Sequence, residues 1–120
     1  MKKRCLSLGV MAILVFALSR WHAGAATNLV RMISTKQYSP QFLTNSVGDT
    51  VLWTNTTTTL HDVASSNSAW ATPAEFIVPG TFRVTFTNAG VFGYFCTPHH
   101  ASGMTGIIFV QGPPNVPPVV

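Results

Sequence analysis

The stretch Val-Phe-Gly-Tyr-Phe-Cys-Thr-Pro-His-His-Ala-Ser-Gly-Met-Thr-Gly-Ile-Ile-Phe-Val, residues 91–110, decides the fold. Its first six and last six residues are mostly apolar, as in β-strands, and a more polar loop connects them. The loop has the spacing C-x2-H-x4-M, formed by Cys96, His99 and Met104. A short loop between adjacent strands brings such side chains together. The stretch therefore predicts a pair of strands and a cluster of possible metal ligands.

Short segments separated by turn residues fill the chain from Thr27 onward. Residues 81–87 alternate, with Phe82, Val84 and Phe86 on one face, and this period of two indicates a half-buried strand. Further strands are expected at residues 29–33, 40–46 and 50–54. Because no segment shows a sustained helical period, the pattern predicts a single all-β domain, either an antiparallel sandwich or a barrel.

Three polar or proline-rich segments interrupt the pattern. Residues 55–59 are rich in Thr and form either a loop or a strand end. Residues 64–73 are rich in Ser, Ala and Asn, which predicts an exposed loop. Residues 112–120 contain four prolines and are expected to form an extended tail.

The first twenty-five residues have the pattern of a secretory signal. Three basic residues, 2–4, precede an apolar stretch at 5–19, and Ala23-Gly24-Ala25 offers a cleavage site after Ala25 or Ala26. A retained membrane anchor is the alternative, but a bilayer span needs about 20 apolar residues. We therefore expect an exported protein, periplasmic or secreted, with a mature domain at 26–111 and no stable membrane anchor.

Removal of this signal changes the charge of the chain. The whole chain has a formal charge of +4, but four of its seven basic residues lie in the first twenty positions. Those that remain balance the acidic residues in number; the charged residues of the mature part are Arg31, Lys36, Arg83, Asp49, Asp62 and Glu75. Phosphate binding requires clustered Lys and Arg, so a nucleic-acid partner is excluded.

One cysteine remains in the predicted mature domain, Cys96, because Cys5 leaves with the signal. In an oxidising compartment an unpaired cysteine is usually explained by pairing or by metal ligation. Thiolate and thioether sulfur suit Cu(I), imidazole suits both copper states, and two His with one Cys and a weak axial Met form a blue-copper site. The remaining ligand is expected to be His61, the only mature histidine outside the loop. The candidate ligands of one type 1 copper ion are His61, Cys96, His99 and Met104.

Blander interpretations of these residues stay open. Cys96 and Met104 could be core residues, and His61 could be a hydrogen-bonded loop residue. A structural zinc site would need four strong ligands, whereas the mature chain offers one Cys and three His, two of them adjacent. His100 is expected to be an exposed loop residue and not a ligand.

The chain resembles the plastocyanin/azurin family of cupredoxins, especially small bacterial plastocyanin-like or amicyanin-like members. The segments that carry the resemblance are 38–40, 47–55, 61–63, 90–99 and 103–106. The resemblance implies a single-domain Greek-key β-sandwich and outer-sphere electron transfer. It places the equatorial copper ligands at His61, Cys96 and His99, and the axial ligand at Met104.

Two positions depart from the pattern of this family. Asp62 stands where the family often has Asn, and it is expected to accept a hydrogen bond from the region of Thr97. Phe95 stands where photosynthetic plastocyanins have a Tyr on an electron-entry path. Since an acidic docking patch is also absent from the sequence, the resemblance implies a non-photosynthetic carrier.

The function expected from these features is one-electron transfer by Cu(II)/Cu(I) cycling. The protein would be a monomer that meets transient redox partners at an apolar rim around His99; the rim residues are Pro98, Ala101, Gly103 and Met104. A periplasmic copper carrier or buffer is the alternative. An enzyme is disfavoured, because a second copper site would need further histidines. A sandwich without metal is the remaining possibility.

Overall fold

The structure is a computed structural model that describes residues 24–113. Nearly all of the predicted signal and most of the predicted tail lie outside the described residues. The strands are β1 (Thr27–Ile33), β2 (Gln37–Ser39), β3 (Phe42–Ser46), β4 (Thr50–Asn55), β5 (Ala64–Ser65), β6 (Gly80–Thr85), β7 (Gly90–Phe95) and β8 (Thr105–Gln111). One 3-10 helix, η1 (Thr97–Ser102), lies between β7 and β8. No helix within residues 24–113 is long and apolar enough to cross a membrane.

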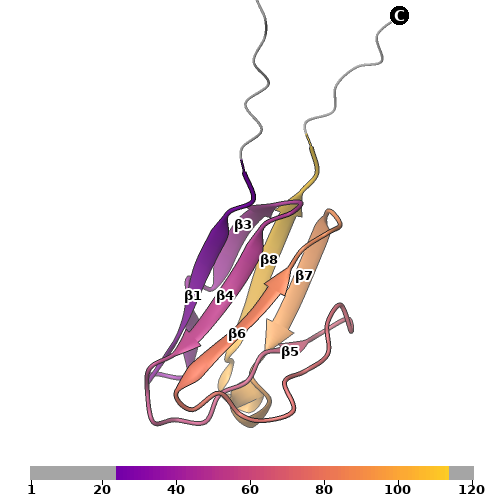
Figure 1. Ribbon diagram of the computed structural model, residues 1–120. Coiled ribbons are helices and arrows are strands. Elements are labelled where there is room, and N and C mark those ends of the chain that lie inside the picture. The colour runs from indigo at the N-terminus through magenta and orange to yellow at the C-terminus, as the bar shows by residue number, and fades with distance from the viewer. Residues whose placement is uncertain (1–23, 114–120) are drawn as a thin grey trace, which may run out of the picture.

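Two four-stranded sheets lie face to face (Figure 1). One has the order β2-β1-β4-β6 and the other β3-β8-β7-β5. The predicted all-β sandwich is confirmed, but the sheets are mixed and not purely antiparallel. The pairs β1–β4 and β3–β8 are parallel. Parallel neighbours cannot be joined by a tight hairpin, so they are distant in sequence, and a local pattern does not reveal their pairing.

Alternating side chains of both sheets fill the space between them. Val51 and Trp53 of β4 and Ile108 of β8 are fully buried in one apolar cluster. Tyr94 of β7 packs edge-to-face on Trp53, with ring centroids 5.3 Å apart. A Cβ at Gly106 would lie 2.3 Å from the Tyr94 side chain, so only glycine fits there. The strands that lead into the loop 96–104 are therefore tightly packed.

The strand predictions hold for the longer segments and fail for the shortest. Strand β2 was not predicted, because three residues are too few to show an alternation. The segment 64–73, expected to be an exposed loop, is a loop from residue 66 onward, but its first two residues form β5 and pair with Tyr94 and Phe95 of β7. In the same segment the Trp70 ring packs on the core, and its Nε1 donates to the Val63 carbonyl at 3.0 Å. Residues 55–59 were expected to be a loop or a strand end. Asn55 is the last residue of β4, and residues 56–59 form a loop.

Both ends of the described chain lie at one end of the sandwich (Figure 1). The helix η1 and the loop that leaves β4 lie at the opposite end. The backbone of Thr50 donates to the Ala26 carbonyl, and that of Val47 donates to Gln111, which ties the first and last strands to the turn before β4. The loop 96–104 is therefore remote from both ends of the described residues.

Candidate metal centre

His61 reaches the centre from a loop that follows β4. An isolated bridge pairs it with Ile77, whose backbone N–H donates to the His61 carbonyl at 2.8 Å. The side chain of His61 is fully buried. The sequence placed His61 after a strand, but its approach to the loop 96–104 depends on the packing of the two sheets.

Backbone hydrogen bonds close the loop that carries the other candidates. The Cys96 N–H donates to the Met104 carbonyl at 3.0 Å, and the Met104 N–H donates to the His99 carbonyl at 3.2 Å. Between them the 3-10 helix ends at Gly103, whose φ of +81° is in the left-handed region. Gly103 therefore turns the backbone so that Met104 returns to Cys96.

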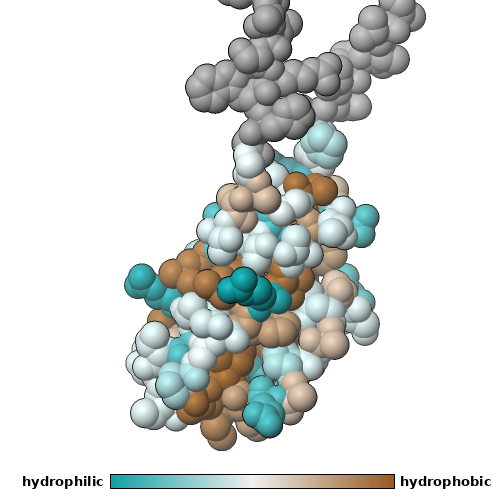
Figure 2. Space-filling view, in the orientation of Figure 1, coloured by the Kyte–Doolittle hydropathy of each residue, from teal (hydrophilic) through white to brown (hydrophobic). Residues whose placement is uncertain are grey.

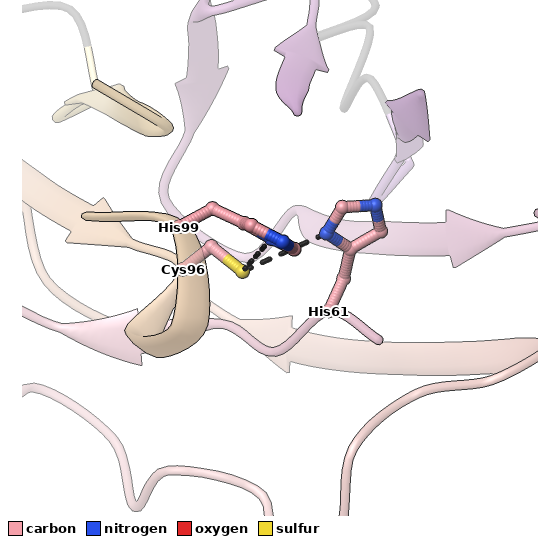
Figure 3. Close-up of side chains that lie close together, drawn as sticks. All are labelled: His61, Cys96 and His99. Carbon is pink, nitrogen blue, oxygen red and sulfur yellow. Dashed lines mark hydrogen bonds between the residues drawn. The ribbon is translucent and has the colours of Figure 1, made fainter. Parts of the chain in front are cut away.

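Figure 3 shows His61, Cys96 and His99 directed toward one another. The Cys96 Sγ lies 3.6 Å from Nδ1 of His61 and 3.5 Å from Nδ1 of His99, and the donor atoms of the three residues all lie within 4.8 Å of one another. Bonds of about 2.1 Å to nitrogen and about 2.3 Å to sulfur, at tetrahedral to trigonal angles, would separate such atoms by about 3.6 to 3.8 Å. One small metal ion of the first transition row therefore fits between them.

Met104 and His100 differ in their environment. Met104 is fully buried, and its backbone is bonded to both Cys96 and His99. His100 is exposed, as expected, and its ring stacks on Phe95 with centroids 4.5 Å apart. Met104 is therefore a buried neighbour of the loop ends, whereas His100 lies outside the group of possible metal ligands.

Comparison with known proteins gives the same chemistry. Residues 26–111 match the family model described as "Copper binding proteins, plastocyanin/azurin family". The chain belongs to this family. Its cofactor is accordingly copper, and the three donor atoms described above can hold one ion.

Individual relatives agree with this assignment. A plastocyanin of Prochlorothrix hollandica is 34% identical over 117 residues, which cover 88% of this chain and 89% of the relative. The reduced state of an amicyanin mutant has a TM-score of 0.61 and 28% identity, and the match covers 71% of this chain and 82% of that chain. A copper-containing nitrite reductase of Thermus scotoductus has a TM-score of 0.62 and 25% identity, covering 72% of this chain and only 23% of that one.

Burial shifts the pKa values of two candidate ligands of this cupredoxin, His61 and Cys96. Burial lowers the pKa of His61, and the neighbouring His99 lowers it further, while Asp62 opposes the shift. A neutral imidazole with a free lone pair is therefore favoured. Burial raises the pKa of the Cys96 thiol, and the charge of Asp62 adds to this, against backbone hydrogen bonds from Asp62 and His99. Metal binding at Cys96 must therefore displace a proton.

The sequence interpretation missed a network that supports His61. Asn55 is 1% exposed, and its Nδ2 donates to the carbonyls of Thr59 at 2.8 Å and Ile77 at 2.5 Å. Its Oδ1 accepts from the backbone of Thr57 at 2.9 Å. One amide thus joins the segments on both sides of the His61 bridge. The only indication in the sequence was a polar residue, Asn55, at the end of an apolar strand, and such residues are too common to predict a network.

Asp62 joins the two segments that carry the candidate ligands. The backbone N–H of Thr97 donates to Asp62 Oδ1 at 2.6 Å, so the expected hydrogen bond is confirmed. The Tyr38 hydroxyl donates to the Asp62 carbonyl at 2.5 Å. Tyr38 is on the unpredicted strand β2, and for that reason its contact with this site could not be predicted.

Proposed function

We propose that the protein is a type 1 copper electron carrier, with His61, Cys96 and His99 as equatorial ligands and Met104 as the axial ligand. The observation that supports this most strongly is the pair of Sγ–Nδ1 distances, 3.6 and 3.5 Å, in a largely buried site. Copper bound there would supply one-electron chemistry between its Cu(II) and Cu(I) states.

The described residues suit this role because they hold the ligands in place. The loop is closed by hydrogen bonds, and the two sheets pack tightly behind it. Burial of Cys96, His61 and Met104 excludes water from the donor atoms. A site that changes little in shape between two oxidation states needs little reorganisation during electron transfer.

An apolar surface around His99 is the proposed docking area. His99 is partly exposed, and Pro98, Ala101 and Gly103 beside it are exposed. Met104 was also expected in this rim, but its side chain is fully buried and takes no part in the surface. Leu60, next to His61, is 51% exposed, and Figure 2 shows hydrophobic side chains at the lower end of the molecule. Weak apolar docking suits transient redox partners of a monomer.

Export is part of the proposal. The supporting observation is the signal pattern in residues 1–25, followed by the domain at 26–111 and the tail at 112–120. We place the mature protein in the periplasm or outside the cell. We assign it no enzymatic role, because within the described residues His100 is the only histidine left to build a second copper site.

The test is to add Cu(II) to the purified mature protein and record its visible spectrum. We expect an intense thiolate-to-copper band that Cys96→Ala abolishes and Met104→Ala shifts. The control His100→Ala should keep the band, because that ring lies outside the ligand group. A colourless wild type would contradict the proposed site. Copper that passes readily to an apo acceptor, without fast redox exchange, would favour the copper-carrier alternative.

A further inference from the structure

Asp62 is a buried acid beside the proposed copper site. Its side chain is 4% exposed, and it directly follows His61 in the chain. Oδ1 accepts the Thr97 N–H at 2.6 Å, at the first residue of the helix that carries His99. The carboxylate therefore lies between the two chain segments that provide the proposed equatorial ligands.

The carboxylate also lies close to the residue that carries the sulfur atom. Thr97, whose backbone N–H it accepts, directly follows Cys96 in the chain. The basic side chains of the described residues are all exposed, on β1, on the turn that follows it, and on β6; they are Arg31, Lys36 and Arg83. Solvent screens those charges, whereas it screens a buried carboxylate much less.

The two oxidation states of copper differ by one positive charge. A fixed negative charge nearby stabilises the more positive state, and a low local dielectric strengthens the effect. We propose that the Asp62 carboxylate lowers the reduction potential of the centre and so adapts the protein to a low-potential partner. This inference rests on the proposed function. It assigns Asp62 a role beyond the hydrogen bond to Thr97.

The charge and the hydrogen bond can be separated by substitution. Asp62→Asn keeps an Oδ1 acceptor for Thr97 and removes the charge. Asp62→Ser also offers an acceptor and is neutral, so it serves as a second variant if the amide disturbs folding. Asp49→Asn is the matched control: its carboxylate accepts the backbone N–H groups of Ala26 and Ser46, at the opposite end of the sandwich.

The experiment is spectroelectrochemistry on the copper-loaded mature proteins, with separate Cu(I) and Cu(II) competition titrations. Both neutral variants of Asp62 should raise the ratio of Cu(I) to Cu(II) affinity about tenfold, which is about 59 mV for a one-electron couple. The control at Asp49 should leave the potential unchanged. In the metal-free proteins, the downfield NMR shift of the Thr97 amide proton should persist in Asp62→Asn, which shows that the hydrogen bond is kept.

The possible failures have different signatures. A wild type without the thiolate-to-copper band contradicts the proposed function itself. A normal band with an unchanged potential in both neutral variants overturns the role of the charge alone. An equal shift in Asp49→Asn would also overturn it, because the effect would then come from the net charge of the protein and not from the position of Asp62.

Discussion

Cys96 is held where burial keeps its thiol protonated until a metal displaces the proton. This residue could be predicted as a ligand from spacing alone, since His99 and Met104 follow it at fixed intervals. The contribution of Asn55 could not be predicted, because its side chain donates hydrogen bonds to two carbonyl groups that come close to it only in the folded chain. Single buried polar residues leave no periodic pattern.

Copper affinity should rise with pH. The pKa of Cys96 is raised above the usual thiol value of about 8.5, and the pKa of His61 is lowered, so at pH 7 to 8 the thiol is protonated and the imidazole is neutral. Each bound ion then displaces about one proton, and the apparent Cu(II) affinity should increase about tenfold per pH unit. Competition titrations at several pH values measure this. The slope should be the same in His100→Ala, and a flat profile would contradict thiolate ligation.

Asn55→Ala should destabilise the fold and weaken copper binding. The substitution leaves two carbonyls, those of Thr59 and Ile77, without their amide partner, at a cost of about 2 to 3 kcal/mol. Urea unfolding and Cu(II) titration measure the two effects. Asn88→Ala is the control, because Asn88 is exposed and bonds only to Thr87 at 3.4 Å. Equal stability of the two variants would contradict this role of Asn55.

At the scale of elements, the strands β7 and β8 with their loop form the unit that the sequence predicts best. Their apolar runs are long enough to recognise, and the loop between them is bounded by Cys96 and Met104. The pairing of β1 with β4, and of β3 with β8, is parallel and distant in sequence, so alternation alone suggested only antiparallel neighbours. The anchors of the loop segment 66–79 could not be predicted, since the partly buried Trp70 and the buried Ile77 are single residues without a periodic pattern.

Gly106→Ala should strongly destabilise the pair β7–β8. The new Cβ would lie 2.3 Å from the Tyr94 side chain, whose ring is held by Trp53 and Tyr38. Overpacking of this kind costs about 1 to 3 kcal/mol. Urea unfolding of the metal-free protein measures the loss.

Gly112→Ala provides the control for Gly106→Ala. A Cβ at Gly112 meets only the Ala89 Cβ, at an ordinary 3.6 Å. Its stability should stay within about 0.5 kcal/mol of the wild type. If both variants unfold at the same urea concentration, the contact between Tyr94 and Gly106 does not limit the packing.

At the scale of the whole molecule, the balance of charge predicts how strongly electrostatic attraction contributes to docking with partners. Residues 26–120 have three basic and three acidic residues, and the surface around His99 consists of small apolar residues. The rate constant of electron exchange should therefore change little with ionic strength, by less than about twofold between low and physiological salt. Stopped-flow measurements with one anionic and one cationic redox reagent test this. A steep salt dependence would point to charge-steered docking.

The two ends of the described chain lie at the pole opposite the ligand loop. A linker attached at either end would therefore leave the His99 surface free. If the protein were anchored to an electrode through residues after Gln111, the surface around His99 would face the solution. The same arrangement is compatible with fusion to a larger protein. In such a fusion this domain could move on its linker and still present the His99 surface to a partner.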